Sequence, residues 1–209
     1  GGFIDALGYP FCRGRVFTTL EKDDGQYDEP CNLLWATGAA LMVRRTDWKD
    51  AGGFDGRFFA HMEEIDFCWR LRSRGRRVVC VSDSRVYHVG GATLSAGSPR
   101  KTFLNFRNNL LLLYKNLPED ELRRALRARR WLDCVAALKF LLTDGYAHAR
   151  AVFAARREFV ARREEFRMQR EENMRLSKSG LVPEIMRPSL LRLYYLKRKK
   201  TFADLQRFL

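Results

Sequence analysis

The pattern of apolar and polar positions divides this chain of 209 residues into three regions. Residues 1–34 are dense in glycine and short polar residues, which predicts turns and loops. Residues 35–117 mix short β-branched runs with stretches of helical spacing, which predicts both strands and helices. Residues 119–209 carry apolar positions at helical spacing among many charges, so we expect this region to be almost wholly helical.

The middle region is predicted to hold two strands and two helices. The strands are expected over 41–43 and 77–81, and the helices over 63–74 and 102–115. Gly75 is placed to end the first helix, because glycine adopts the left-handed conformation of a helix C-terminus at little cost. Pro118 follows the second helix, and proline cannot continue a helix interior.

The positive charge of the chain lies almost wholly in its second half. The net charge is +14, yet residues 1–100 hold 14 Lys and Arg against 13 Asp and Glu. Residues 101–209 hold 25 basic residues against 12 acidic ones. This asymmetry favours an anionic partner for the second half, such as nucleic acid, anionic lipid or a phosphorylated substrate.

Hydropathy and cysteine usage predict the cellular location. The longest nearly apolar stretch, residues 131–142, contains Asp133 and Lys139 and is shorter than the about 20 residues that span a bilayer. The five cysteines are scattered without a Cys-x-x-Cys pair, which favours thiols in a reducing compartment over a disulfide framework or a zinc site. We expect a cytoplasmic protein, either soluble or peripheral on the inner face of the cell membrane.

The densest group of chemically useful residues lies at the start of the helix over 63–74. Glu63, Glu64 and Asp66 fall within four positions there. On a helical repeat Glu64 borders the buried face, where a carboxylate is half desolvated but faces the positive end of the helix dipole. That setting suits a general base. The alternative is structural, because acidic residues favour the first turn of any helix.

Several motifs in order carry a resemblance to a known family. They are Gly52-Gly53-Phe54-Asp55, Phe58-Phe59, Glu63-Glu64-Ile65-Asp66, Trp69-Arg70-Leu71 and Gly75. The agreement extends to Trp35-Ala36-Thr37-Gly38, Tyr87-His88-Val89-Gly90-Gly91 and Asn105-Phe106-Arg107-Asn108-Asn109. Over about residues 1–117 the chain resembles the family 2 glycosyltransferases of the rhamnosyltransferase-like bacterial type.

The resemblance implies a fold and a division of the chain. The fold is of the α/β class, and residues 1–117 would be the second, acceptor-side half of a glycosyltransferase-A-type sandwich for nucleotide-sugar transfer. The N-terminal, nucleotide-binding half would be missing, and residues 118–209 would form a basic helical extension. On this interpretation the chain by itself is inactive, because it lacks the half that binds the nucleotide.

The resemblance also implies a catalytic base. In the family the second acid of the pair takes this role, which falls on Glu64. Glu63 stays an alternative, because this chain has Glu at the position where the family most often has Asp. Asp66 completes the acidic motif. The reaction would be an inverting transfer of a sugar from a nucleotide-sugar donor to a hydroxyl of a glycan or lipid-linked acceptor.

Further residues are candidates for binding substrate. Arg107 and Asn108 suit a diphosphate or sugar hydroxyls, although a solvated helix face with capping amides explains them equally well. Trp35, beside Thr37 and Gly38, could stack on a sugar or belong to the core. His61 could line the acceptor site or only pack beside the phenylalanines before it.

A divalent metal, Mg²⁺ or Mn²⁺, is expected in the intact enzyme. In related enzymes a histidine near the position of His88 joins an Asp-x-Asp motif in holding the ion. A lone histidine is more often structural. The Asp-x-Asp partner does not occur in a suitable setting in this chain, since Asp23-Asp24 lies in an acidic loop.

Two alternatives without catalysis concern the basic second half. The first is a module that binds nucleic acid; clustered arginines favour it, and the absence of any known nucleic-acid-binding signature opposes it. The second is a helical region on an anionic membrane surface, with Trp131, Phe140 and the Tyr- and Lys-rich segment 194–200 as anchors. The membrane alternative is compatible with sugar transfer to a lipid-linked acceptor.

Overall fold

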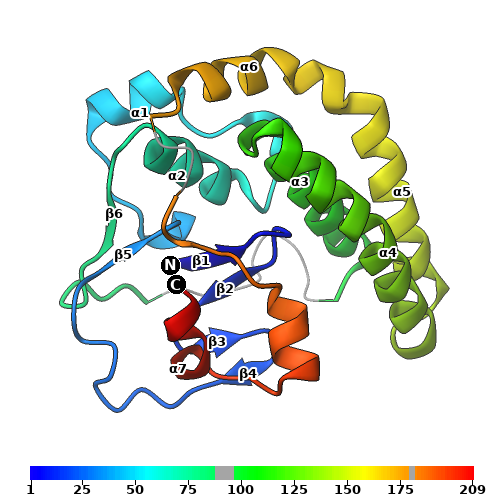
Figure 1. The fold of residues 1–209 in the computed structure, drawn as a ribbon, viewed down its shortest axis with the longest axis horizontal. Helices are drawn as coiled ribbons and strands as arrows, with labels where there is room; N and C mark the ends of the chain where they lie inside the picture. Colours follow the sequence, from blue (N-terminus) through cyan, green and yellow to red (C-terminus); the bar gives the residue numbers. More distant parts are fainter. Residues whose placement is uncertain (88–96, 179–181) are drawn as a thin grey trace. The chain divides into compact units, whose positions relative to one another are not determined.

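The computed structural model describes residues 1–87, 97–178 and 182–209 and forms two compact units (Figure 1). Unit 1 holds the described residues of 1–53, 67–87 and 177–209, and unit 2 those of 54–66 and 88–176. Helix α2 (Glu63–Ser73) begins in unit 2 and continues into unit 1.

Unit 1 is built on a small sheet of five short strands. Their order is β4 (Thr19–Leu20), β3 (Arg15–Val16), β2 (Pro10–Cys12), β1 (Gly2–Asp5) and β7 (Ile185–Met186). The first four strands are antiparallel neighbours, whereas β7 runs parallel to β1, with Ile4 opposite Ile185. A second, two-stranded sheet pairs β5 (Cys31–Leu33) with β6 (Val78–Cys80).

The helical parts of unit 1 are short apart from α2. They are α1 (Arg45–Ala51), α7 (Phe202–Leu205), a π-helical turn over Arg192–Leu196, and 3-10 turns over Gly38–Ala40 and Gln206–Phe208. Helix α1 ends at Gly52, whose φ of 78° is left-handed. A side chain on the next residue, Gly53, would stand 2.9 Å from the ring of Trp48. These two constraints explain the glycine pair.

Unit 2 is predominantly helical. Its helices are α3 (Pro99–Asn116), α4 (Glu119–Thr143), α5 (Tyr146–Arg162) and α6 (Arg167–Leu176), with 3-10 turns over Gly56–Phe58 and Arg163–Phe166. Helix α5 packs against both α3 and α4. Ser98 caps α3 by accepting a hydrogen bond of 3.3 Å from the backbone N–H of Lys101. The leucines 110–113 are fully buried.

The mixed α/β class is confirmed, and so are several elements of the middle region. The helix expected over 63–74 is α2, and Gly75 after it has a φ of 80°. The helix expected over 102–115 is α3, which begins three residues earlier. The strand expected over 77–81 is β6, although only Val78 of this strand is buried.

Three expectations of secondary structure are wrong. Residues 41–43 form no strand, and the Met42 side chain is 97% exposed. Residues 1–34 are not turns and loops alone, because five short strands, β1 to β5, lie among them. Residues 119–209 are not almost wholly helical, since the described part of the C-terminal segment includes β7 in the sheet of unit 1. The proposed functional division at residue 117 stays a prediction.

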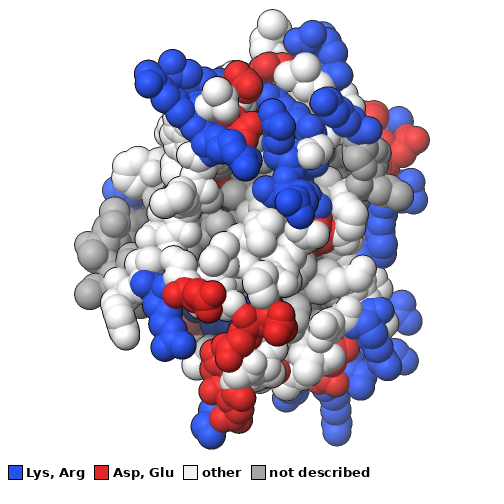
Figure 2. Space-filling model, turned by 90° about the vertical axis from the view of Figure 1, so that its left-hand side faces the viewer, with Lys and Arg blue, Asp and Glu red and all other residues white. Residues whose placement is uncertain are grey.

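Among the described residues, no helix is both long and apolar enough to cross a membrane. On the face shown in Figure 2, Lys and Arg side chains stand beside Asp and Glu side chains in several places.

Candidate active site

The loop that leads into α2 has an unusual backbone. Phe59, His61 and Met62 have φ values of 68°, 69° and 74°. Residues with side chains rarely adopt positive φ, and such strain persists only where the surroundings hold it. The loop therefore needs partners that fix its conformation.

Asn108 of α3 supplies one such partner. Its side-chain nitrogen lies 2.9, 2.7 and 2.9 Å from the carbonyl oxygens of Phe58, Ala60 and His61, so its two hydrogens are shared among three acceptors. Asn108 is fully buried. One amide group thus adds hydrogen bonds to three carbonyl groups of the turned backbone.

Arg107 holds the same loop from beside Asn108. Its Nη2 lies 3.0 Å from the carbonyl oxygen of Phe58, and its Nε donates to Asn108 Oδ1 at 2.9 Å. Its Nη1 pairs with Glu158 at 3.3 Å. Burial lowers the pKa of Arg107, against the influence of Glu158. Since Arg107 and Asn108 direct their polar atoms at the protein, the structure favours a positioning role for both over substrate binding.

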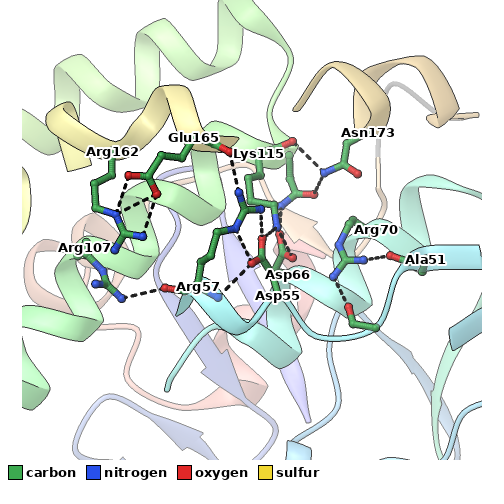
Figure 3. A network of polar contacts seen from close by, with 12 residues as sticks. Ala51, Asp55, Arg57, Asp66, Arg70, Arg107, Lys115, Arg162, Glu165 and Asn173 are labelled. Carbon is green, nitrogen blue, oxygen red and sulfur yellow. Dashed lines mark hydrogen bonds and ion pairs between the residues drawn. The ribbon is translucent and has the colours of Figure 1, made fainter. Parts of the chain in front are cut away.

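Lys115 of α3 is the centre of a buried ionic network (Figure 3). Its Nζ lies 2.8 Å from Asp55 Oδ2 and 2.8 Å from Asp66 Oδ2. Asn116 donates to the other oxygen of Asp66 at 2.9 Å. The exposed fractions of Lys115 and Asp66 are 1% and 0%. Removing one partner of such a buried group costs about 3–5 kcal/mol, because it leaves an uncompensated charge.

This network also sets the protonation of Asp55. Burial raises the pKa of the Asp55 carboxyl, but the bonds from Arg57 and Lys115 more than offset it and hold that pKa far below its usual range. Asp66 uses both carboxylate oxygens in the network. Because both oxygens are bonded within the protein, Asp66 is better suited to anchor the first turn of α2 than to contact substrate.

Glu63, Glu64 and His61 form a different kind of group. Glu63 Oε2, Glu64 Oε2 and His61 Nε2 are buried atoms for which the described residues provide no hydrogen-bond partner. Buried polar atoms without partners are rare in proteins and call for an explanation. A bound hydroxyl of a substrate would supply partners of the right chemistry.

The electrostatics of Glu64 and His61 agree with a role in proton transfer. Burial raises the pKa of Glu64, and the negative charge of Glu63 raises it further, while backbone N–H groups at the helix start oppose the rise. A carboxylate with a raised pKa is a stronger base. Burial, followed by the charge of Lys101, lowers the pKa of His61, so its ring is neutral near pH 7.

The other predicted substrate residues belong to unit 1. Trp35 is buried, and its indole N–H donates to the carbonyl oxygen of Phe3 at 3.0 Å. Its ring is therefore part of the core, which agrees with the structural interpretation and not with stacking on a sugar. Thr37 precedes the 3-10 turn, which begins at Gly38. A Cβ atom added to Gly38 would meet no other atom within 4 Å, so packing does not require glycine at this position.

The expected metal site was assigned to His88. His88 lies outside the described residues. Within 1–87, 97–178 and 182–209, no three His, Cys, Asp or Glu side chains gather as ligands would. The described residues therefore offer no complete ligand set for Mg²⁺ or Mn²⁺, and the metal remains an expectation.

Sequence reasoning assigned no role to Lys115 or to Asp55 and did not find a pocket. A signal for Lys115 existed, because this lysine directly follows the apolar run Leu110-Leu111-Leu112-Leu113-Tyr114. The pocket lies in unit 1 and has a volume of about 570 Å³. Arg13, Tyr27, Cys31 and Phe202 are among its lining residues, and none of the predicted site residues is.

Comparison with known proteins adds independent information. The chain is 34% identical over 88 residues to the N-acetylglucosaminyl-diphospho-decaprenol L-rhamnosyltransferases of two Mycobacterium tuberculosis strains, CDC 1551 and H37Rv. It is 32% identical over 98 residues to the O-antigen biosynthesis protein RfbC of Myxococcus xanthus. The matches point to a glycosyltransferase family.

These matches are partial. The mycobacterial alignment covers 42% of this chain and 28% of the relatives, and the Myxococcus alignment covers 46% of this chain and 7% of RfbC. The chain therefore spans well under half the length of these relatives. No family model matches the chain, and no solved structure matches it.

Proposed function

We propose that this chain is the acceptor-side part of an inverting glycosyltransferase. It would move a sugar from a nucleotide-sugar donor to a hydroxyl of a glycan or lipid-linked acceptor. The observation that carries the proposal is the pair Glu63 and Glu64, whose buried carboxylate oxygens lack partners among the described residues at the start of a firmly held helix. The printed names of the relatives, which include a rhamnosyltransferase, support sugar transfer.

Glu64 is the proposed general base. Its carboxylate takes the proton of the acceptor hydroxyl, while the hydroxyl oxygen forms a bond to the anomeric carbon of the sugar. The bond from that carbon to the diphosphate breaks on the opposite side, so the nucleoside diphosphate leaves with the electron pair and the configuration inverts. One base suffices for this single displacement, in contrast to the paired carboxylates of glycosidases.

Glu63 and His61 would support this step. The charge of Glu63 raises the pKa of Glu64 and so strengthens the base. The neutral His61 ring offers a nitrogen without a partner in the described structure, suited to the acceptor. Asn108, Arg107 and Lys115 fix the backbone that carries these groups. A divalent metal, when bound in the intact enzyme, would neutralise the leaving diphosphate.

The test joins this chain to a nucleotide-binding half taken from the mycobacterial relative. Transfer to a lipid-linked acceptor is measured with a panel of uridine, guanosine and thymidine diphosphate sugars, rhamnose included. The chain without that half should neither bind nor turn over any of them. In the joined protein, Glu64→Gln should reduce turnover by about 10²–10⁴-fold, the usual contribution of a positioned base, with donor affinity kept.

Two further variants distinguish the roles within the helix. Glu63→Gln should reduce turnover less than Glu64→Gln. Glu164→Gln is the matched control, because its carboxylate is exposed on a short turn of unit 2 and pairs only loosely with Arg163 at 3.5 Å. If Glu63→Gln abolishes turnover while Glu64→Gln remains active, the general base is Glu63 and not Glu64. Full activity in both Glu63→Gln and Glu64→Gln would refute the catalytic proposal.

A further inference from the structure

Helix α4 presents a continuous stripe of exposed residues that its packing does not use. Four apolar side chains follow one another at spacings of four, three and four positions, and a helical repeat brings such positions to one side. They are Trp131, Val135, Leu138 and Leu142, with exposed fractions of 75%, 64%, 58% and 78%. Arg124 and Arg127 continue the same line toward the helix start, at spacings of three and four. We call these six residues the α4 outer stripe.

The opposite side of α4 is occupied by packing within unit 2. Ala137 belongs to a core cluster with Ala149 and Val152 of α5. Arg129 and Asp133 are buried and paired at 3.0 Å, and Arg156 of α5 contacts Asp133 at 2.9 Å. The helix is therefore held through its inner side, and the outer stripe is left for another contact.

The structure corrects one expected anchor. Phe140 packs inward, with its ring 6.2 Å from that of Phe106 and 5.8 Å from that of His148. Only Trp131, of the two helical anchors expected from the sequence, is exposed. The sequence alone could not distinguish the two, because both are aromatic residues of one apolar stretch.

The charges beside the stripe have one sign. Between Glu121 and Asp144, the exposed charged side chains of α4 are all basic: Arg123, Arg124, Arg127, Arg130 and Lys139. The single acid in this range, Asp133, is buried and paired. Along residues 122–143 the exposed apolar side chains therefore lie beside basic ones, which matches a membrane surface with an apolar interior and anionic headgroups.

We propose that the α4 outer stripe binds the surface of an anionic phospholipid membrane. Trp131 and the three aliphatic side chains would enter the boundary between headgroups and acyl chains, and the arginines would contact lipid phosphates. A second copy of the chain is a poorer occupant, because the stripe offers no acid to pair with the arginines of its copy. Crossing the bilayer is not needed, and no described helix is both long and apolar enough to do so.

This contact deepens the proposed function, because it would bring the enzyme to the membrane that holds a lipid-linked acceptor. Only this role in reaching the acceptor rests on the proposed function; the membrane contact itself does not. Vesicle binding needs neither a sugar donor nor an acceptor, so its outcome is independent of the transfer assay.

The experiment measures flotation of the full chain with vesicles. Vesicles of phosphatidylcholine with phosphatidylglycerol should bind the chain, and vesicles of phosphatidylcholine alone should bind it weakly. The combined variant Trp131→Ser, Leu138→Ser, Leu142→Ser should lose roughly tenfold or more in affinity, because its apolar contact area is removed. Arg124→Gln and Arg127→Gln should each lose about fivefold. All the altered side chains are exposed, so thermal melting should stay unchanged.

Matched controls come from unit 1. The variant Leu20→Ser, Met42→Ser, Val81→Ser removes three exposed apolar side chains, and Arg45→Gln with Lys49→Gln removes two exposed charges. Both controls should bind vesicles nearly as the parent chain does. Equal binding by the stripe variants and the controls would overturn the proposal. Sedimentation that shows a dimer lost only in the serine variant would overturn it in favour of a second copy.

Discussion

Glu64 and Asp66 lie two positions apart on one helix and yet have opposite surroundings. Asp66 is fully buried and accepts bonds from Lys115 and Asn116. Glu64 has one buried oxygen for which the described residues offer no partner, and its pKa is raised. A buried carboxylate oxygen without a hydrogen-bond partner disfavours the folded state. Such a cost at a residue is expected where the residue serves function.

The raised pKa of Glu64 predicts how the variant Glu64→Gln changes stability. A carboxyl whose pKa is higher in the folded state contributes stability that is fully present below its unfolded pKa and is lost as pH rises through the folded one. The wild-type chain therefore carries a penalty at neutral pH that Gln does not. Thermal melts should show Glu64→Gln above wild type at pH 7 and equal to it below about pH 4.

The exposed control Glu164→Gln should show no such dependence on pH. A lower melting temperature of Glu64→Gln at pH 7 would mean that the Glu64 carboxylate has a stabilising partner. The combination expected here, a more stable but inactive variant, is one that a purely structural acid would not produce.

Helix α3 holds the loop before α2 and the first turn of α2 through four polar side chains. Arg107 and Asn108 hold the loop carbonyls, while Lys115 and Asn116 hold the first turn of α2 through Asp66. Polar side chains among buried leucines are costly unless they are fully bonded. These four are bonded, so the position of the carboxylates follows from how α3 packs.

Two substitutions at Asn108 test this organisation. Asn108→Ala should destabilise the chain by about 1–3 kcal/mol, because it leaves backbone carbonyl groups without donors. Asn108→Asp should cost more, since a carboxylate oxygen would face the same carbonyl oxygens. Urea denaturation measures both. In the joined enzyme, turnover should also fall in the fraction that remains folded.

Asn105→Ala serves as the control on the same helix, at a half-buried position. It should leave stability nearly unchanged, because alanine is a good helix former. If Asn108→Asp proves as stable as wild type, Asn108 does not hold the loop as a donor.

Unit 1 depends on both ends of the chain. Strand β7 pairs with β1, and the buried carboxylate of Asp5 accepts the backbone N–H of Leu190 at 2.7 Å. The ring of Phe202 stacks on that of Phe3 with 5.4 Å between centroids. The N-terminal strand therefore cannot complete its core without residues almost two hundred positions away.

Removal of residues 177–209 should consequently affect the two units differently. Hydrogen exchange should lose protection in β1 and β2, because β1 loses a neighbouring strand and its core loses Phe202. Helices α3 and α5 should keep theirs, since they pack on each other within unit 2. Leu196→Ser, at an exposed position of the same segment, is the control and should change neither. Unaltered protection of β1 would show that the segment is dispensable.

The amino-acid sequence by itself determined the features that depend on neighbours along the chain. The helices over 63–73 and 99–116, the left-handed Gly75 and the mixed α/β class follow from spacing and from single-residue preferences. These signals act within a few residues, where helical hydrogen bonds and side-chain contacts form. The acidic group at the start of α2 was visible for the same reason.

The tertiary structure alone decided which distant residues meet. Strands of two to four residues in the first region and β7 carry little signal of their own, because their hydrogen bonds come from partners far away in sequence. The same holds for Arg107 and Asn108, which bond the loop, and for Phe140, which turns inward while Trp131 stays exposed. A side chain's chemistry limits what it can bond, but packing decides which partner it finds.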